Sequence, residues 1–306
     1  MGVLADVFTT YKATGNLEDL TSFISDISPL EAPMYDRIGT VGSKGRYHEW
    51  QTDSLAAAAA NIGNEGDQFT AVARTPTNRY GNYCQIMEKQ FTVSDTQNIV
   101  AKAGRANETA YQMTKAAKEL KRDMEYVLWY TTIGATGGVG NTSAGMVMRN
   151  VFSWQTSCGI TSGGNAVLSA SASAVMAEAD FNQGLQNIWS QGGTPGTVYV
   201  NGPLKRVISG WATSTSRVWT GEKKVTNVLS VYESDFGTVE TVLDRYVTTN
   251  MAYVIDDNLY KKAVLVPVKA VPLAKRGIGV DSMLWTQWTL EARNPSGSGF
   301  TFSSPS

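Results

Sequence analysis

Hydrophobic positions recur most regularly between Ala106 and Tyr130, where neither Gly nor Pro interrupts the chain. Apolar side chains alternate steps of four and three residues, which is the spacing of one face of an α-helix. They are Ala106, Ala110, Met113, Ala117, Leu120, Met124 and Val127. Charged side chains lie off this stripe, at Lys115, Lys118, Lys121, Arg122 and Glu125. The pattern predicts one unbroken helix of roughly 37 Å, a spine with one buried face.

Ahead of the spine, residues 1–39 have the pattern of an N-terminal arm. Residues 1–16 are short, mixed in character and without a core of their own. Leu17 to Ile27 then carry apolar residues at helical spacing, and Ser28 with Pro29 marks a second helix start, in a segment that ends at Gly39. We expect this arm to dock on its own subunit or on a neighbour.

Residues 40–93 have the texture of a long two-stranded excursion. Residues 46–52 alternate in the manner of a strand, and Asn82 to Thr92 form a second run of strand type. The connection between them is rich in Ala, Gly, Asn and Thr, and is too long for a hairpin turn. Because an isolated hairpin is marginal in water, we expect this loop to find its partners outside its own domain. A short helix capped by Ser94 or Asp95 follows, and Gly104 bends the chain into the spine.

The second half of the chain changes to a mixed α/β pattern. The segment 134–164 is dense in Gly, Ser and Thr and is predicted to be mostly loop. Asp180 is placed to cap a helix that ends at Gly192 and Gly193, with Phe181, Leu185, Ile188 and Trp189 on one face. Thr197–Val200 is predicted to be a buried strand. Gly202 and Pro203 open a helix whose inward residues are Leu204, Val207, Ile208 and Trp211.

The remaining elements are predicted to be strands. The candidates are Val225–Tyr232, Thr238–Leu243, Ala252–Ile255 and Ala263–Val268. A period of two between Leu284 and Glu291 predicts a half-buried strand. From Asn294 onward the sequence has the composition of a tail.

Charge and cysteine content narrow the classes of function. The 306 residues include 26 basic and 27 acidic side chains, with a sequence pI near 6.0, so a protein that reads DNA sequence is disfavoured. Cys84 and Cys158 are too few for a disulfide scaffold. The first residues lack the pattern of a secretory signal, and no run of about 18 apolar residues occurs, so we expect a protein that is soluble and cytoplasmic when made, without a membrane partner.

Candidate chemistry is sparse, and we predict no catalytic, cofactor-binding or metal-binding residues. His48 is the only histidine, so a catalytic triad would have to be built on it inside the excursion. One histidine and two distant cysteines do not make a usual zinc site. The carboxylate pairs Glu233 with Asp235 and Asp256 with Asp257 have the pattern of solvated turn residues, although a carboxylate site stays open.

Two further patterns favour structure over ligand binding. The glycines of residues 134–140 are not followed by the Lys-Ser or Lys-Thr of a phosphate loop, which favours a flexible loop. Trp189, Trp211 and Trp288 lie on apolar faces, which favours core positions over sugar binding.

The order of the elements, together with four sequence motifs, resembles a known family. The motifs are HEWQTDSL at His48–Leu55, AGRANETAYQ at Ala103–Gln112, KELKRDME at Lys118–Glu125 and TLEARNPSGSG at Thr289–Gly299. They are similar to the major capsid proteins of tailed bacteriophages, in the podophage SU-ten-like branch of the Hong Kong 97-type fold. The likeness covers residues 16–130 and 181–299 and is weak across 134–180.

The resemblance implies an α+β fold with an N-terminal arm (1–39), an extended loop (40–93), the spine helix of a peripheral domain (94–133), an axial domain (134–270) and a returning peripheral strand with a tail (271–306). It implies a non-enzymatic protein that self-assembles as hexamers and pentamers into an icosahedral shell around double-stranded DNA. The implied partners are a portal and, in some capsids, scaffolding or decoration proteins. Because the arm motifs begin almost at Met1, the expected scaffolding protein is a separate one, or none. The implied location is the virion capsid, assembled in the host cytoplasm.

Two alternatives stay open on the sequence alone. One is a cellular shell of the same fold, similar to an encapsulin, that encloses protein cargo. The other is a hydrolase that uses carboxylates.

Overall fold

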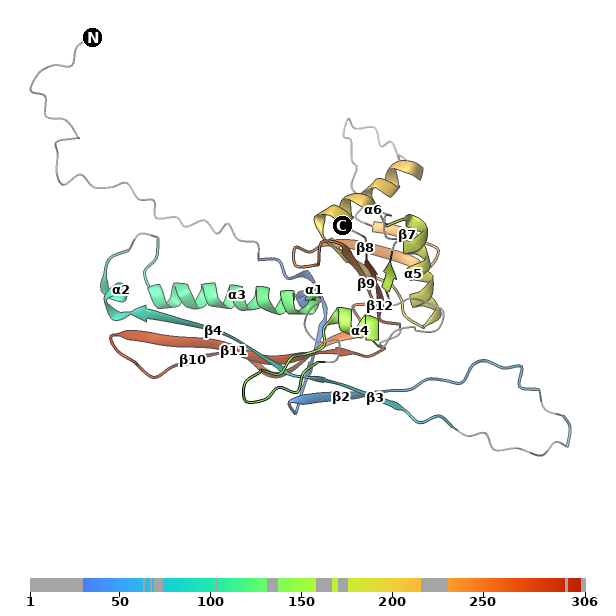
Figure 1. Cartoon of the computed structure of the whole chain (residues 1–306), viewed down its shortest axis with the longest axis horizontal. Helices are drawn as coiled ribbons and strands as arrows, with labels where there is room; N and C mark the ends of the chain where they lie inside the picture. The colour runs from blue at the N-terminus through green and yellow to red at the C-terminus, as the bar shows by residue number, and fades with distance from the viewer. Residues whose placement is uncertain are drawn as a thin grey trace, which may run out of the picture.

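The computed structural model describes residues 30–62, 64–66, 68, 74–102, 104–130, 137–157, 167–169, 176–215, 231–294 and 297–303. The expected arm helix at Leu17–Ile27, the residues Val225–Ser230 and Cys158 lie outside this part of the chain. Figure 1 shows a long helix lying along a narrow sheet, a hairpin that projects from it, and a compact mixed domain at one end.

The spine helix is present as α3, Glu108–Trp129, and its start is fixed by Asn107, whose side chain accepts a hydrogen bond from the Ala110 N–H. Its second half matches the expected stripe, with Leu120, Met124 and Val127 buried. Nearer the start the stripe is wrong, because Ala106, Ala110 and Ala117 are exposed and Ala116 is buried in place of Ala117. Steps of four and three follow a period of 3.5 residues, so on a helix of 3.6 residues per turn the stripe drifts by about 20° per heptad away from the surface beneath it.

A four-stranded sheet, the spine sheet, supports α3. Its order is β1 (Gly39–Gly42), β10 (Tyr260–Pro272), β11 (Gly279–Ala292) and β4 (Gln85–Ser94). The short helix α2 (Asp95–Ile99) turns the chain from β4 toward α3, capped by Ser94 as expected, and Gly104 has the expected left-handed bend with φ of 74°. β11 is not half-buried as predicted, because from Thr286 to Ala292 both of its faces are buried, and it contacts α3, β2 and β3.

The extended loop begins as an antiparallel hairpin, β2 (Tyr47–Thr52) with β3 (Asn78–Tyr83). The predicted alternation in β2 is confirmed, since His48, Trp50 and Thr52 are partly buried and the residues between them are exposed. The single predicted strand Asn82–Thr92 is in fact two strands. β3 pairs within the hairpin and β4 pairs with β11, so the chain changes sheets at Cys84.

The mixed domain, which corresponds to the expected axial domain, is built on a six-stranded sheet, the axial sheet. Its order is β5 (Val167–Ser169), β12 (Gly299–Ser303), β9 (Met251–Ile255), β6 (Thr197–Val200), β8 (Gly237–Leu243) and β7 (Val231–Ser234). The helices α5 (Glu178–Ser190) and α6 (Gly202–Thr215) pack against this sheet, with α5 in contact with β12 and α6 in contact with β8. The predicted buried strand Thr197–Val200 is confirmed at all four positions.

Two segments predicted to be mostly irregular each contain one regular element. The segment 134–164 contains α4 (Val151–Ser157), whose Trp154 is fully buried in the core beneath the spine. The predicted tail contains β12, which pairs with both β9 and β5 and buries Phe300. Small polar residues dominate both stretches, and only contacts with distant segments make them regular.

Two details of α5 also differ from expectation. The helix begins after Ala177, so Asp180 lies in its first turn and is not the cap. Trp189 is 62% exposed and contacts the ring of Phe236 at a tilt instead of entering the core, whereas Phe181, Leu185 and Ile188 are buried as predicted. Trp288 is fully buried, and Trp211 is partly buried against the hydrophobic core that α5 and α6 form with the six-stranded sheet.

Candidate assembly surfaces

The hairpin is fixed rigidly at its base and exposed at its far end. At the base, the indole N–H of Trp50 donates to the Ala292 carbonyl at 2.8 Å, and Nε2 of His48 lies 2.9 Å from a carboxylate oxygen of Glu291. At the far end, Leu55 is 97% exposed and Ile62 is 87% exposed. Large apolar side chains that their own subunit leaves in water are typical of protein contact sites.

Asn82 ties β3 to two other segments. Its Nδ2 donates to the carbonyls of Leu290 at 2.8 Å and Arg149 at 3.0 Å, and its Oδ1 accepts the Arg149 N–H at 2.7 Å. An amide side chain that is buried and uses both of its ends resists rotation, because every alternative orientation leaves buried polar groups unpaired. The direction of the hairpin is therefore set by the spine sheet and by the segment that precedes α4.

Aromatic rings fill the space between the hairpin base and α4. The ring of Trp154 lies 5.3 Å from that of Trp50 and 6.2 Å from that of Tyr80, measured between centroids. The Arg149 guanidinium lies 4.0 Å from the centre of the Trp154 ring, within the range of a cation–π contact. The hairpin base is thus part of the core, and only the distal residues extend away from it.

The end of the arm is anchored where the spine meets the mixed domain. The short helix α1 (Pro33–Arg37) presents two backbone N–H groups to the carboxyl of Glu125, from Met34 at 3.1 Å and from Tyr35 at 2.7 Å. The predicted helix start at Ser28 and Pro29 lies outside the described residues, and α1 begins at Pro33. Glu125 is fully buried, so placing it on the solvent side of the spine was wrong.

A second carboxyl lies against the first. The indole N–H of Trp129 donates to Oε1 of Glu125 at 3.1 Å and to Oδ2 of Asp244 at 2.6 Å. Burial, together with the hydrogen bond that protonated Glu125 donates to the Asp244 carboxylate and the charge of that carboxylate, raises the pKa of Glu125 to about 8. The arm, the spine helix and the strand end after β8 therefore share one buried polar cluster.

Ion pairs at the surface surround this joint. Arg37 makes two hydrogen bonds of 2.7 and 2.8 Å to Glu240 of β8, and Lys121 donates to Asp36 at 2.8 Å. Exposed pairs of this kind contribute little stability, about 0 to 1 kcal/mol each, but two bonds between planar groups fix orientation.

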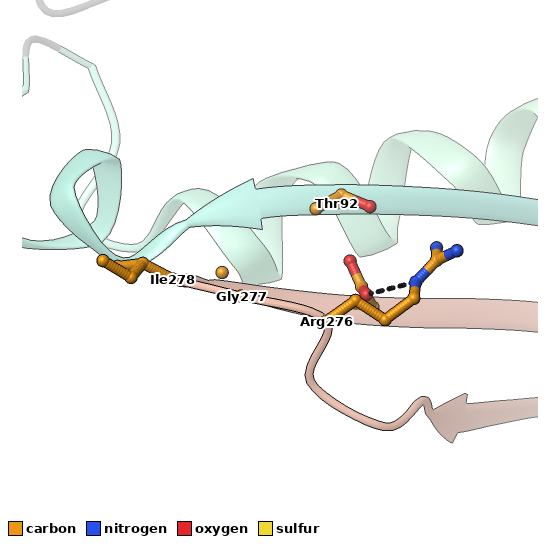
Figure 2. Close-up of a pocket in the computed structure, with 6 residues that line it drawn as sticks. Thr92, Arg276, Gly277 and Ile278 are labelled. Carbon is orange, nitrogen blue, oxygen red and sulfur yellow. Dashed lines mark hydrogen bonds and ion pairs between the residues drawn. The ribbon is translucent and has the colours of Figure 1, made fainter.

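The far end of the spine carries an open pocket with a volume of about 360 Å³, lined by Thr92, Arg276, Gly277, Ile278, Gly279 and Asp281. Figure 2 shows Thr92 on β4 across from Arg276, whose Nε lies 3.3 Å from the Asp281 carboxylate. Hydrogen bonds from Thr92 and Arg276 lower the pKa of Asp281, so this carboxyl is ionised. Ile278 is 81% exposed, and Ile99 and Val100 of the neighbouring turn are also exposed, which gives this tip an apolar surface.

Comparison with known proteins assigns the chain to a family. A family model described as SU10 major capsid protein matches residues 7–302. The chain belongs to this family. As a capsid subunit it is similar to the major capsid protein of Escherichia phage Phieco32, with 26% identity over 342 residues that cover 97% of this chain and 96% of that protein.

Solved capsids share the fold of this SU10-family subunit. The capsid asymmetric unit of cyanophage A-1(L) superposes with a TM-score of 0.69 at 11% identity, covering 97% of this chain and 98% of that one. Mycobacterium phage Adephagia gives a TM-score of 0.64 at 11% identity, covering 99% of both chains. The predicted Hong Kong 97-type capsid fold is confirmed. The subunit is a phage major capsid protein, a structural component of the virion and not an enzyme, so the carboxylate hydrolase is excluded.

The residues singled out for possible chemistry have structural places in the capsid subunit. His48 lies at the fixed base of the hairpin, not in a mobile segment, and Cys84 is buried beside Ser43. Asp256 is buried and accepts the backbone N–H groups of Thr194 and Asn258, so its assignment to solvent was wrong.

Other parts of the sequence-based assignment have different outcomes. Asp257 is partly buried and accepts hydrogen bonds from the hydroxyls of Thr197 and Tyr199, which also contradicts a solvated turn. Glu233 and Asp235 are exposed near the turn between β7 and β8, as predicted. Across the described ranges, no three His, Cys, Asp or Glu side chains gather as a metal site would need, and no helix there is long and apolar enough to cross a membrane.

Sequence reasoning missed the residues that fix the joint and the hairpin, namely Glu125, Asp244 and Asn82. Glu125 carried one usable signal, because it falls one residue after the apolar Met124 and two before Val127, within the buried arc of the helix. Nothing adjacent in sequence marks Asp244 or Asn82, since the hydrogen-bond partners of their side chains are 67 or more residues away except for Tyr246.

Proposed function

We propose that the subunit forms hexamers and pentamers that close into an icosahedral head shell around double-stranded DNA. The observation that carries this proposal is the hairpin, which is rigid at its base and apolar at an exposed end. A closed shell of identical subunits needs heterologous contacts, in which one surface meets a different surface of the next copy. A projecting element with a fixed direction supplies one side of such a contact.

We also propose a functional division of the chain: an arm at 1–39, an extended loop at 40–93, a peripheral spine at 94–133 with a returning strand at 271–306, and an axial domain at 134–270. By their sheet pairing, β1, β4 and β10 belong to the spine sheet and β12 belongs to the axial sheet, so these strands cross the proposed boundaries. The spine and the axial sheet form the body of the subunit, while the arm and the loop make contacts with neighbours.

The proposed partners follow from this role. A head shell needs a portal for DNA entry, and scaffolding or decoration proteins are compatible with it. Phage G, whose capsid matches at a TM-score of 0.57 and 10% identity, has decoration proteins beside its major capsid proteins. The near balance of 26 basic and 27 acidic residues favours enclosure of DNA without sequence-specific binding. Assembly in the host cytoplasm is part of the same proposal.

Electron microscopy of the expressed full-length chain tests the proposal. We expect rings or closed shells, and particles that carry duplex DNA after infection. Shells that enclose protein without nucleic acid would favour the cargo compartment. Sedimentation at the monomer mass of 33.0 kDa across concentrations and salts would contradict self-assembly.

A double variant makes this test specific to the hairpin. Leu55→Asp with Ile62→Asp changes two side chains that are almost fully exposed, so the subunit should fold and melt as the wild type does. We expect the variant to lose shells while keeping its melting temperature. Normal shells would show that the distal hairpin is not a contact.

A further inference from the structure

Glu125 and Asp244 form a buried pair of acids at the point where three segments meet. Both side chains are buried, and their carboxyl groups are hydrogen-bonded to each other. Their other bonds come from N–H groups: Met34 and Tyr35 donate to Glu125, Tyr246 donates to Asp244 at 2.8 Å, and Trp129 donates to both. In the part of the chain that the structure describes, neither acid makes an ion pair with a basic side chain.

The charged groups around the pair are engaged elsewhere. Lys262 of β10 interacts electrostatically with Glu125 but does not bond to it. Its ammonium donates to the Tyr35 carbonyl at 2.6 Å and lies 4.1 Å from the centre of the Tyr35 ring. From α1, Arg37 is bound to Glu240 and Asp36 is bound to Lys121 of α3.

The axial sheet presents two neutral phenols to the cluster. Tyr199 of β6 and Tyr253 of β9 pack against the Trp129 ring at 5.2 and 4.9 Å, and burial raises the pKa of both. Arg245, next to Asp244 in sequence, reaches out to Glu31 at 3.7 Å. Among the described residues, therefore, no neighbouring element brings a compensating positive charge into the cluster.

Chemistry then requires the pair to retain one proton. Two ionised carboxylates in contact, without a cation, repel each other strongly in a dry environment. With one proton, the O–H of one acid donates to the oxygen of the other, and the N–H groups satisfy the remaining oxygens. When that proton leaves, the hydrogen bond between the acids is lost and repulsion replaces it.

We propose that the Glu125–Asp244 pair is a proton-dependent latch that holds the arm end and the axial domain to the spine helix. Holding the proton keeps α1 seated on Glu125 and keeps the strand end after β8 seated on Trp129. Losing it loosens both attachments together, because they depend on the same two carboxyl groups. The latch acts within one subunit and does not depend on the shell.

The direction of the pH dependence follows from the pKa of Glu125, which rises from 4.5 to about 8 on folding. The folded state then holds one more proton than the unfolded state between these values. The stability of the latch is fully present below pH 4.5, falls as the pH rises toward 8, and is lost above it. The loss levels off once both states are deprotonated.

Thermal unfolding of the unassembled full-length chain tests the latch with two matched variants. Glu125→Gln removes the titration and keeps the shape of the side chain. Glu119→Gln removes a partly exposed carboxylate from the same helix, so it controls for net charge. We expect the melting temperature of the wild type and of Glu119→Gln to fall by about 3 °C per pH unit from pH 5.5 to 8 relative to Glu125→Gln, and to level off above pH 8.

The slope is the measurement, so a variant that is less stable at every pH still gives an answer. Asp244→Asn should flatten the profile as Glu125→Gln does. Hydrogen exchange of the Met34 and Tyr35 amides, expressed as protection factors, should show a selective loss above pH 8 in the wild type and not in Glu125→Gln. Parallel melting profiles for the wild type and Glu125→Gln, or protection that does not change with pH, would overturn the proposal.

Discussion

Replacing Asn82 with Ala should destabilise the subunit strongly, although the change removes only a small polar side chain. Asn82 is buried, and its amide makes three hydrogen bonds to the backbone, at 2.7, 2.8 and 3.0 Å. Alanine would leave the carbonyls of Leu290 and Arg149 and one N–H without these partners. At about 1 to 1.5 kcal/mol for each bond, the expected loss is about 3 to 5 kcal/mol.

Circular dichroism during heating measures this loss. For a chain of this size each kcal/mol lowers the melting temperature by about 2 to 4 °C, so we expect a decrease of about 10 °C. Asn78→Ala is the matched control, because Asn78 lies on the same strand and is exposed. The control should melt within about 2 °C of the wild type.

The comparison of the two variants decides the reasoning. If Asn82→Ala and Asn78→Ala have the same melting temperature, this amide does not hold the hairpin base. The direction of the hairpin must then come from the aromatic contacts alone. If Asn82→Ala melts early and also fails to form shells at a temperature where it is folded, the orientation of the hairpin matters for assembly as well as for stability.

Three further changes test other parts of the molecule. Deleting Leu55–Arg74 should leave a folded subunit that assembles poorly, because the base of the hairpin belongs to the core and its distal part does not; a loss of helical circular dichroism would contradict this. Met124→Asp should destabilise the subunit by several kcal/mol, since Met124 is buried in the core and an unpaired carboxylate there is costly, and a soluble variant with normal melting would show that this face is wet. Mature particles boiled in denaturant with reductant should run as one monomer band, because residues 46–80 contain no lysine for an isopeptide bond and Lys89 pairs with Asp123 at 2.7 Å, whereas a ladder of multimers would refute this expectation.

Local patterns predicted those elements whose signal lies within one stretch of sequence. The spine was expected at 106–130 and occupies Glu108–Trp129, and the buried strand Thr197–Val200 was placed correctly. The signal for each lies in its own residues, and Asn107 fixes the start of the spine. The family resemblance added the arrangement of the elements, which periodicity alone does not supply.

The errors have a common physical origin in contacts between distant segments. Glu125 is charged by sequence yet buried, because backbone N–H groups about 90 residues earlier satisfy its carboxyl. β12 lies in a stretch rich in Ser and Gly, and its regularity depends on pairing with β9 and β5. Trp189 shows the reverse case, since helical spacing gives the face of a residue relative to its neighbours but does not tell where the sheet ends.

The position of β12 within its sheet has a consequence for synthesis. This strand is the last described element along the chain, yet it lies between β5 and β9 and not at an edge. A nascent chain therefore cannot complete the axial sheet until the ribosome has passed residue 303 and this strand has emerged. Because pairing between distant segments is slow, a subunit still attached to the ribosome, or released early, lacks a finished axial domain. Truncated chains would in this way be excluded from a shell that is built from many copies of the subunit, without a separate proofreading protein.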